Sequence, residues 1–217
     1  MIMMENEKHF DRIDKMYGSI SFIYDIWITL GMLSENSPLR KKSIDSLNLL
    51  EGNIVMDICC GTGLNFKLIQ NKIGQSGKII GVDLTLKMLN VAKKRCEKYS
   101  WSNINLINSN ILDFKTDTRG DFALSTAAMG IIPEYCKAID LVMDNLKEGG
   151  RFVILDMKLS NRYPFRLFNY LYCKFAKAAG FDIENRDLIS YIKSKYIVEF
   201  YKEYMGGFRY IITFKKS

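Results

Sequence analysis

Asp57, Gly61 and Gly63 form the part of the sequence whose residue types and spacing best suit a chemical role. Asp57 stands near the end of an apolar stretch, residues 54–58, which predicts a buried strand, and the chain that follows Gly63 predicts a helix. Glycine has no Cβ, so the backbone of such a turn can bend sharply and a ligand can lie against it. The helix would direct its free N–H groups and the positive end of its dipole at the same place. This pattern is typical of a nucleotide-like cofactor site.

The residues around the turn exclude two common nucleotide ligands. A dinucleotide fingerprint has the spacing G-x-G-x-x-G, and Phe66 stands where its third glycine should be. The phosphate-binding motif G-x-x-x-x-G-K-[S/T] does not occur in the sequence. Asp83 ends the next predicted strand, 20 residues after Gly63, and its carboxylate can accept hydrogen bonds from both ribose hydroxyls of an adenosine. The pattern therefore indicates an adenosine cofactor with no phosphate to neutralise.

Both acidic residues also have a structural interpretation. Asp57 could bond the backbone of its own turn, and Asp83 could cap the helix that begins after it. The glycine turn, Asp83 and the later pair Gly149-Gly150 nevertheless occur in order and in register with the predicted strands. Their combination favours the cofactor interpretation.

The surrounding sequence alternates between predicted strands and helices. Strands are predicted at 54–58, 78–83, 105–107, 121–127 and 151–157, and helices at 64–73, 85–98 and 134–146. Continuously apolar strands that alternate with helices are typical of a parallel sheet covered on both faces. Right-handed connections make this an α/β protein with a Rossmann-like doubly wound sheet.

The two ends of the chain depart from that alternation. Residues 1–48 show helical spacing without strands and are expected to form a helical cap. A lid helix is predicted at 163–179, and strands at 197–204 and 208–214 flank Gly206-Gly207, which indicates a hairpin. The last of seven strands should therefore run antiparallel. We expect one domain over residues 1–217, with a cap at 1–48, a cofactor-binding core at 50–157, and the lid helix and hairpin at 158–217.

These features together resemble the class I S-adenosylmethionine (SAM) methyltransferases, whose seven-stranded sheet has an antiparallel last strand. The Asp-x-Cys-Cys-Gly-Thr-Gly sequence that begins at Asp57 is similar to that of the quinone C-methyltransferases of ubiquinone and menaquinone biosynthesis. The family usually has glycine where this chain has Cys59. The resemblance implies an enzyme that converts SAM to S-adenosylhomocysteine and methylates a small or lipophilic acceptor, either a quinone precursor or a phospholipid amine.

The resemblance also implies roles for individual residues. Gly61, Thr62 and Gly63 would bind the amino-acid part of SAM, Asp83 the ribose, and Leu84 the adenine face. Asn110 stands where the family has aspartate, and its carbonyl can accept from the adenine amino group; it could equally be a turn residue. Thr126 would face the sulfonium. The full predicted cofactor set is Asp57, Gly61, Thr62, Gly63, Asp83, Leu84, Asn110, Ile111 and Thr126.

The acceptor and the catalytic residues are less well defined. Tyr17 and Tyr24 in the cap, together with Met129 after the fourth strand, are expected on the acceptor side, although the two tyrosines also fit a core-facing helix. The one histidine, His9, lies near the N-terminus, which disfavours a histidine general base. No catalytic residue is assigned, and the reaction would depend on in-line positioning.

The net charge of +7 lies in the last third of the chain, where residues 151–217 hold 13 Lys and Arg against 6 Asp and Glu. An ordinary solvated surface explains this excess, and so does attraction to lipid headgroups or nucleic acid. The lid helix combines Arg166, Lys174 and Lys177 with an apolar stripe. It suits a lipid interface, the lid of an apolar pocket, or plain packing on the sheet.

Composition places the chain in a reducing compartment. Its 5 cysteines lack the spacing of a metal site, so no metal is expected. The N-terminus has no apolar signal region, and no long uncharged apolar window is present. We expect a cytoplasmic protein, with peripheral membrane contact left open.

Two other functions compete with the methyltransferase interpretation. Cys59 and Asn110 depart from the family pattern and are compatible with a SAM-binding or lipid-surface protein without turnover. A nucleic-acid methyltransferase is disfavoured, because residues 125–129 read Ser-Thr-Ala-Ala-Met where amino-methylating DNA enzymes carry Asp/Asn-Pro-Pro-Tyr/Phe.

Overall fold

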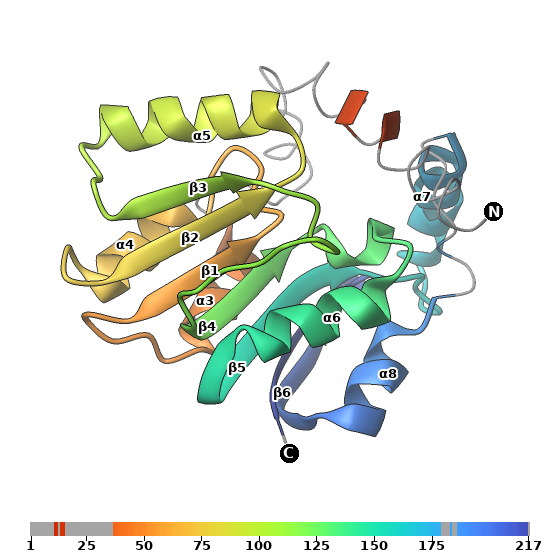
Figure 1. The fold of residues 1–217 in the computed structure, drawn as a ribbon. Coiled ribbons are helices and arrows are strands. Elements are labelled where there is room, and N and C mark those ends of the chain that lie inside the picture. Colours follow the sequence, from red (N-terminus) through yellow and green to blue (C-terminus); the bar gives the residue numbers. More distant parts are fainter. Residues whose placement is uncertain (1–10, 13, 16–36, 179–182, 184–185, 217) are drawn as a thin grey trace.

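Seven strands form one mixed sheet (Figure 1), and the predicted cofactor residues lie at or just beyond the carboxyl ends of its parallel strands. The computed structural model describes residues 11–12, 14–15, 37–178, 183 and 186–216. The sheet order is β3-β2-β1-β4-β5-β7-β6. The strands are β1 (Ile54–Ile58), β2 (Lys78–Asp83), β3 (Ile104–Asn108), β4 (Gly120–Thr126), β5 (Leu146–Met157), β6 (Ile197–Tyr204) and β7 (Arg209–Lys215).

Helices cover both faces of this sheet (Figure 1). On one face lie α3 (Pro38–Asp45), α4 (Phe66–Ile73) and α5 (Leu86–Lys98). On the other lie α6 (Tyr135–Asp144) and α8 (Leu188–Lys195). The helix α7 (Arg166–Ala178) and the short turns η1 (Met129–Ile131) and η2 (Met205–Gly207) complete the described elements. Among these helices, none is both long and apolar enough to cross a bilayer.

The strand sequences divide their side chains between two cores. In β1, Val55 packs with α3, α4 and α5, whereas its neighbour Met56 packs with α6 and α8. Successive side chains of a strand point to opposite faces, so a strand buried on both sides must be apolar throughout. Both residues are fully buried, which explains why β1 shows no polar alternation.

The predicted architecture is confirmed. The strands β1 to β5 pair in parallel, and β7 runs antiparallel to both β5 and β6. The turn at Gly206-Gly207 joins β6 to β7, as expected. Pro38 stands at the first position of α3, where the fixed φ of proline suits a helix. Most of the predicted cap, residues 1–36, lies outside the described residues apart from four positions. The division into cap, core and lid therefore stays a prediction.

Two elements differ from the sequence prediction. The strand β5 begins at Leu146 and includes Gly149-Gly150, and its pairing with β4 shifts register between Gly120 and Phe122. Gly149 has φ 73°, so the glycine pair forms an irregularity in the strand and not a turn before it. The helix α8 was not predicted, because its two buried residues, Leu188 and Ile192, are too few to establish a helical period.

Candidate cofactor site

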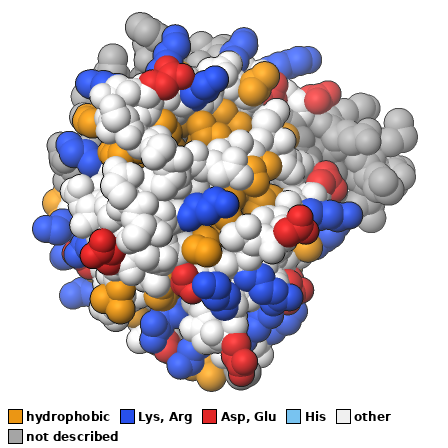
Figure 2. Space-filling view, turned by 60° about the vertical axis from the view of Figure 1, so that its left-hand side comes forward, with side chains coloured by type: hydrophobic (Ala, Val, Ile, Leu, Met, Phe, Trp, Pro, Cys, Tyr) orange, Lys and Arg blue, Asp and Glu red, His pale blue; other side chains and the backbone are white. Residues whose placement is uncertain are grey.

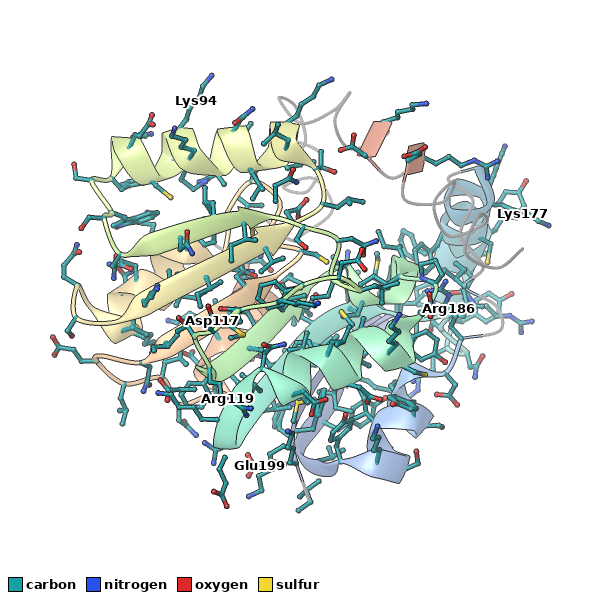
Figure 3. The ribbon with its side chains drawn as sticks, viewed as in Figure 1. Lys94, Asp117, Arg119, Lys177, Arg186 and Glu199 are labelled. Carbon is teal, nitrogen blue, oxygen red and sulfur yellow. The ribbon has the colours of Figure 1, made fainter. Side chains whose placement is uncertain are left out.

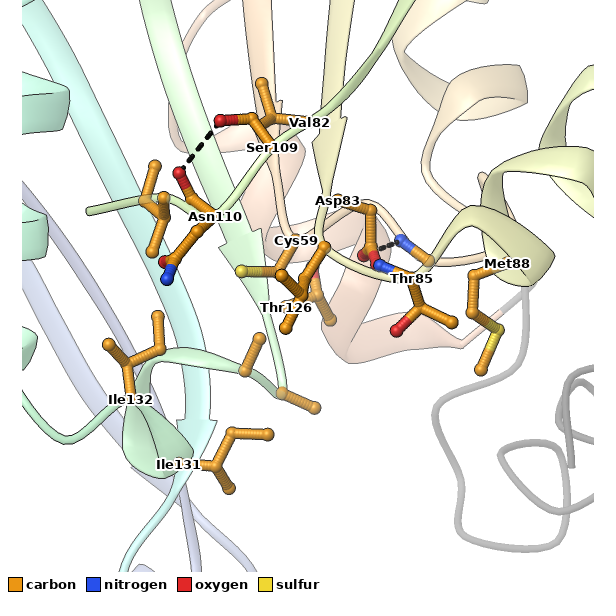
Figure 4. A pocket seen from close by; sticks show the side chains of 15 residues that line it. Cys59, Val82, Asp83, Thr85, Met88, Ser109, Asn110, Thr126, Ile131 and Ile132 are labelled. Atoms are coloured by element: carbon orange, nitrogen blue, oxygen red, sulfur yellow. Dashed lines mark hydrogen bonds between the residues drawn. The ribbon is translucent and has the colours of Figure 1, made fainter. Parts of the chain in front are cut away.

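A cleft of about 690 Å³, part of which is open to solvent, lies at the carboxyl ends of β1, β2 and β4 (Figure 4). Ligands of open α/β sheets bind at this edge, where neighbouring strands lead to opposite faces. Six predicted cofactor residues line the cleft: Gly61, Asp83, Leu84, Asn110, Ile111 and Thr126. The sequence prediction missed its other lining residues, which are Cys59, Val82, Thr85, Met88, Ser109, Ala127, Ala128, Ile131 and Ile132.

Asp83 is fixed at the end of β2 by two backbone N–H groups. Its Oδ2 accepts from the N–H of Gly61 at 2.7 Å, and its Oδ1 accepts from the N–H of Thr85 at 2.9 Å. Burial raises the pKa of Asp83, and the two N–H groups oppose that increase. Each carboxylate oxygen can accept more than one hydrogen bond. Asp83 can therefore hold the glycine turn and still accept from two ligand hydroxyls.

Cys59 occupies the position at which the resembled family has glycine. Its φ is 55°, in the left-handed region that glycine adopts without penalty. The backbone thus keeps the glycine-like conformation although the side chain differs. Burial raises the pKa of the Cys59 and Cys60 thiols well above their ordinary value, and the carboxyl of Asp83 raises both further. Neither thiol is suited to act as a nucleophile.

Thr62 and Gly63 do not line the cleft. A Cβ built on Gly63 would lie 2.5 Å from two ring carbons of Phe66, which is fully buried. A Cβ on Gly81 would likewise lie 3.0 Å from Phe66 Cζ. The Phe66 ring therefore fills space that side chains at both glycine positions would need. Phe66, whose presence argued against a dinucleotide site, therefore also explains why glycine stands at position 63.

Asp57 lies beneath the turn, in a buried network that the sequence did not reveal. Asn65 Nδ2 donates to both carboxylate oxygens of Asp57, at 2.8 and 3.0 Å, and Arg40 donates to Asn65 Oδ1. All three residues are buried. Burial raises the pKa of Asp57 to about 7, while the hydrogen bond from Asn65 and the charge of Arg40 lower it in part. The network ties α3 to the end of β1 and supports the turn from below.

Asn110 and Ile111 follow β3 and reach the cleft from the other side. Asn110 Oδ1 accepts from the N–H of Leu112 at 3.0 Å, so this residue makes the turn considered in the sequence analysis and also lines the cavity. Figure 4 shows its amide group directed into the cavity. Ile111 is buried, and Met88 contributes a further apolar side chain opposite it. Apolar surfaces with one amide between them suit the face and edge of an adenine.

The charge of the lining discriminates between cofactors. Asp83 is its one charged residue, and within the described part of the chain no Lys or Arg lines the cleft. A pyrophosphate would find no cation there, whereas a sulfonium is attracted to the acidic wall. The residues present therefore fit SAM, with Asp83 for the ribose and the apolar residues near Ile111 for the adenine. Thr126, the last residue of β4, lines the cleft as well.

Of the three predicted acceptor residues, Met129 is the one that the structure describes, and it does not line this cleft. Met129 is fully buried in the core between the sheet and α6. Tyr17 and Tyr24 lie outside the described residues. Residues next to Met129 do reach the cavity, because the turn η1 places Ile131 at its wall.

Comparison with known proteins identifies related sequences over most of the chain. The profile described as the ubiE/COQ5 methyltransferase family matches residues 3–199. A demethylmenaquinone methyltransferase of Oceanobacillus iheyensis is 25% identical over 196 residues, which cover 89% of this chain and 76% of the relative. Another, from Staphylococcus carnosus, is 28% identical over 175 residues, which cover 80% and 71%.

Solved structures show the same fold at lower identity. A geranyl diphosphate C-methyltransferase from Streptomyces coelicolor, crystallised with S-adenosyl-L-homocysteine, superposes with a TM-score of 0.68 at 14% identity and covers 82% of this chain and 78% of its own. A phosphoethanolamine N-methyltransferase from Haemonchus contortus gives 0.70 at 18% identity, with 88% and 45% covered. These similarities concern the fold.

Proposed function

We propose, because the chain belongs to the ubiE/COQ5 methyltransferase family, that this SAM-dependent methyltransferase methylates a ring carbon of a quinone precursor. The acidic cleft, which no Lys or Arg among the described residues lines, is the observation that supports the cofactor. The names of the curated relatives, which are demethylmenaquinone methyltransferases, support the acceptor class. The sheet also supports one domain over the chain, since β7 of the C-terminal part pairs with β5 of the core.

SAM supplies a methyl group that its sulfonium already activates. The residues of the chain then have three tasks. Asp83 orients the cofactor through the ribose, and its negative charge stabilises the cationic ligand in a buried site. Ile131 and Ile132 form an apolar wall that limits access of water to the reacting end of the cleft. The rate enhancement would come from this alignment, which can contribute several kcal/mol, about 7–11 in favourable cases.

Two measurements test the proposal separately. Titration calorimetry with S-adenosylhomocysteine should give micromolar affinity; no binding at 1 mM ligand, about −4 kcal/mol or weaker, would contradict the cofactor. Mass spectrometry of a reaction with SAM and a short-chain demethylmenaquinol should show one added methyl group. Methylation of phosphoethanolamine and not of the quinol, at equal concentrations, would replace the acceptor class.

The exposed face of α7 supports contact with an anionic lipid surface. Tyr163, Leu167 and Tyr170 are 73%, 64% and 70% exposed. Leu167 and Tyr170 are three residues apart and share one side of α7, and Tyr163 lies in the turn before this helix. Lys174 and Lys177 continue that side, and Figure 3 shows Lys177 pointing away from the protein. Residues 157–181 contain no Asp or Glu. Exposed aromatic and aliphatic side chains beside lysines, in a segment of the sequence without acids, suit a headgroup interface.

By contrast, charges of both signs are interspersed on the face that Figure 2 shows. Vesicle flotation tests the difference between α7 and the rest of the surface. Substitution of Lys174 and Lys177 by glutamine should weaken binding to phosphatidylglycerol vesicles about 30-fold, at about 1 kcal/mol per lysine. The same change at Lys93 and Lys94 on α5, which Figure 3 places on the opposite side of the view from α7, is the matched control. Equal losses in both pairs, or no binding by the wild type, would contradict an α7-specific contact.

A further inference from the structure

A second cavity, of about 700 Å³, adjoins the cofactor cleft. Gly130 of η1 lines this second cavity, whereas the next two residues, Ile131 and Ile132, line the first. The two cavities therefore meet at η1. The other lining residues of the second cavity are Met157, Lys158, Leu159, Tyr172, Ile183, Arg186, Asp187, Leu188, Ile189 and Tyr210.

The turn η1, at which the two cavities meet, is held through both the N–H and the carbonyl groups of its backbone. Asp156 Oδ2 accepts from the N–H of Gly130 at 2.7 Å. Arg186 Nη1 donates to the carbonyl oxygens of Gly130 and Ile132, at 2.8 and 2.6 Å. Buried groups satisfied in this way rigidify their surroundings. Asp156 and Arg186 thus hold η1 in place where the two cavities meet, and Gly130 adds no side chain between them.

The polar side chains of the second cavity are mainly hydrogen-bond donors. Lys158, Arg186, Tyr172 and Tyr210 can all donate, and burial raises the pKa of both tyrosines so that their hydroxyls stay protonated. Among the described lining residues the one acid is Asp187, which caps α8 by accepting from the N–H of Ser190 at 3.0 Å. A ligand that suits this cavity therefore carries acceptor oxygens, and the cations favour an oxygen with negative charge.

Lys158 lines this cavity and is anchored by two partners. Its ammonium donates to Glu203 and, at 3.3 Å, to the hydroxyl of Tyr201. Burial lowers the pKa of Lys158, but these two partners outweigh burial and raise it overall, so the cation is maintained. Apolar side chains line the cavity as well, with Leu188 buried and Met157 at the end of β5. An anchored cation and apolar side chains in one cavity match a flat ring with one oxygen substituent.

We infer that the second cavity binds the acceptor, and that Lys158 and Tyr172 recognise an ionised ring oxygen of a hydroxyaromatic molecule. The inference rests on the proposed function and names the site at which its acceptor is held. Neither residue was singled out as a ligand by the sequence, because Lys158 lies in a generally basic third of the chain and Tyr172 in an apolar stripe.

The chemistry gives these donors a defined task. Loss of the O–H proton to solvent leaves a phenolate, which makes the adjacent ring carbon nucleophilic. That carbon forms a bond to the methyl carbon, the S–CH₃ bond breaks, and its electron pair stays on sulfur as a thioether. The ring carbon then gives up its hydrogen as a proton and the oxygen regains one, so one proton is released overall. Donors at the oxygen favour the charged form that reacts.

Paired naphthalene ligands test the recognition directly, without turnover. In protein saturated with S-adenosylhomocysteine, 1-naphthol should bind about 10- to 100-fold more tightly than 1-methoxynaphthalene, the range expected for one hydrogen bond to a charged group. Bound 1-naphthol should also ionise at lower pH than free 1-naphthol, read from its absorbance. The Lys158→Met variant should lose both differences, and Tyr172→Phe should reduce the first.

Lys147→Met provides the matched control, because Lys147, within β5, is also in an ion pair, with Asp121 at 2.7 Å, but lies outside both cavities. It should behave as the wild type. Unchanged discrimination in both Lys158→Met and Tyr172→Phe, with folding confirmed by thermal unfolding, would overturn the assignment. So would equal affinities in the wild type. Failure of the proposed function is distinguishable, because it would appear first as absent binding of S-adenosylhomocysteine.

Discussion

The Asp83→Ala variant is expected to bind S-adenosylhomocysteine about 100-fold more weakly than the wild type, because two charge-assisted hydrogen bonds of about 1.5 kcal/mol each are lost. The expectation follows from the position of the carboxylate in the cleft, where Asp83 is the one charged residue among the described residues of the lining. Titration calorimetry of the purified variants measures the effect. Asp113→Ala, on an exposed residue outside the cleft, should leave the affinity unchanged.

A second ligand separates ribose recognition from support of the turn, since Asp83 also accepts from the N–H groups of Gly61 and Thr85. For the wild type, the 2′-deoxy analogue of S-adenosylhomocysteine should bind about tenfold more weakly than the parent ligand. For Asp83→Ala the two ligands should bind equally, because the partner of the hydroxyl is gone. A variant that still prefers the parent ligand tenfold would show that Asp83 acts only through the turn.

The fold was largely predictable because its strands leave a strong sequence signal. Strands such as β1 are buried on both faces, so they appear as short apolar runs between polar or glycine-rich segments. The glycine turn and Asp83 could be placed at one edge because parallel strands bring their carboxyl ends together. The hairpin followed from Gly206-Gly207. In each case one local pattern sufficed.

Features that depend on distant contacts were not predictable. The network of Arg40, Asn65 and Asp57 joins three elements, and nothing near Arg40 in the sequence indicates that it is buried. The second cavity is similarly built from η1, β5, α7, the start of α8 and β7. The sequence also could not distinguish a packing role of Gly63 and Phe66 from a role in cofactor binding, because only the folded structure shows that the two residues lie against each other.

The Gly63→Ala variant is expected to lose about 3 kcal/mol of stability, which urea unfolding measures. Gly63 has φ 77°, which costs an L-residue about 1 kcal/mol. The new methyl would in addition lie 2.5 Å from the Phe66 ring, and overpacking of a filled core costs about 1–3 kcal/mol. Gly149→Ala isolates the first contribution, because Gly149 has φ 73° and nothing lies within 4 Å of a Cβ built there.

The double variant Gly63→Ala/Phe66→Leu then tests whether the ring is the cause. A smaller side chain at position 66 removes the clash and leaves the backbone strain, so the double variant should be more stable than the sum of the single losses by about 1 kcal/mol or more. Equal losses in Gly63→Ala and Gly149→Ala would instead mean that the ring moves aside without cost. Because Gly63 does not line the cleft, the folded double variant should retain near wild-type affinity for S-adenosylhomocysteine. A large loss of affinity at preserved stability would return Gly63 to the cofactor contact that the family resemblance implies.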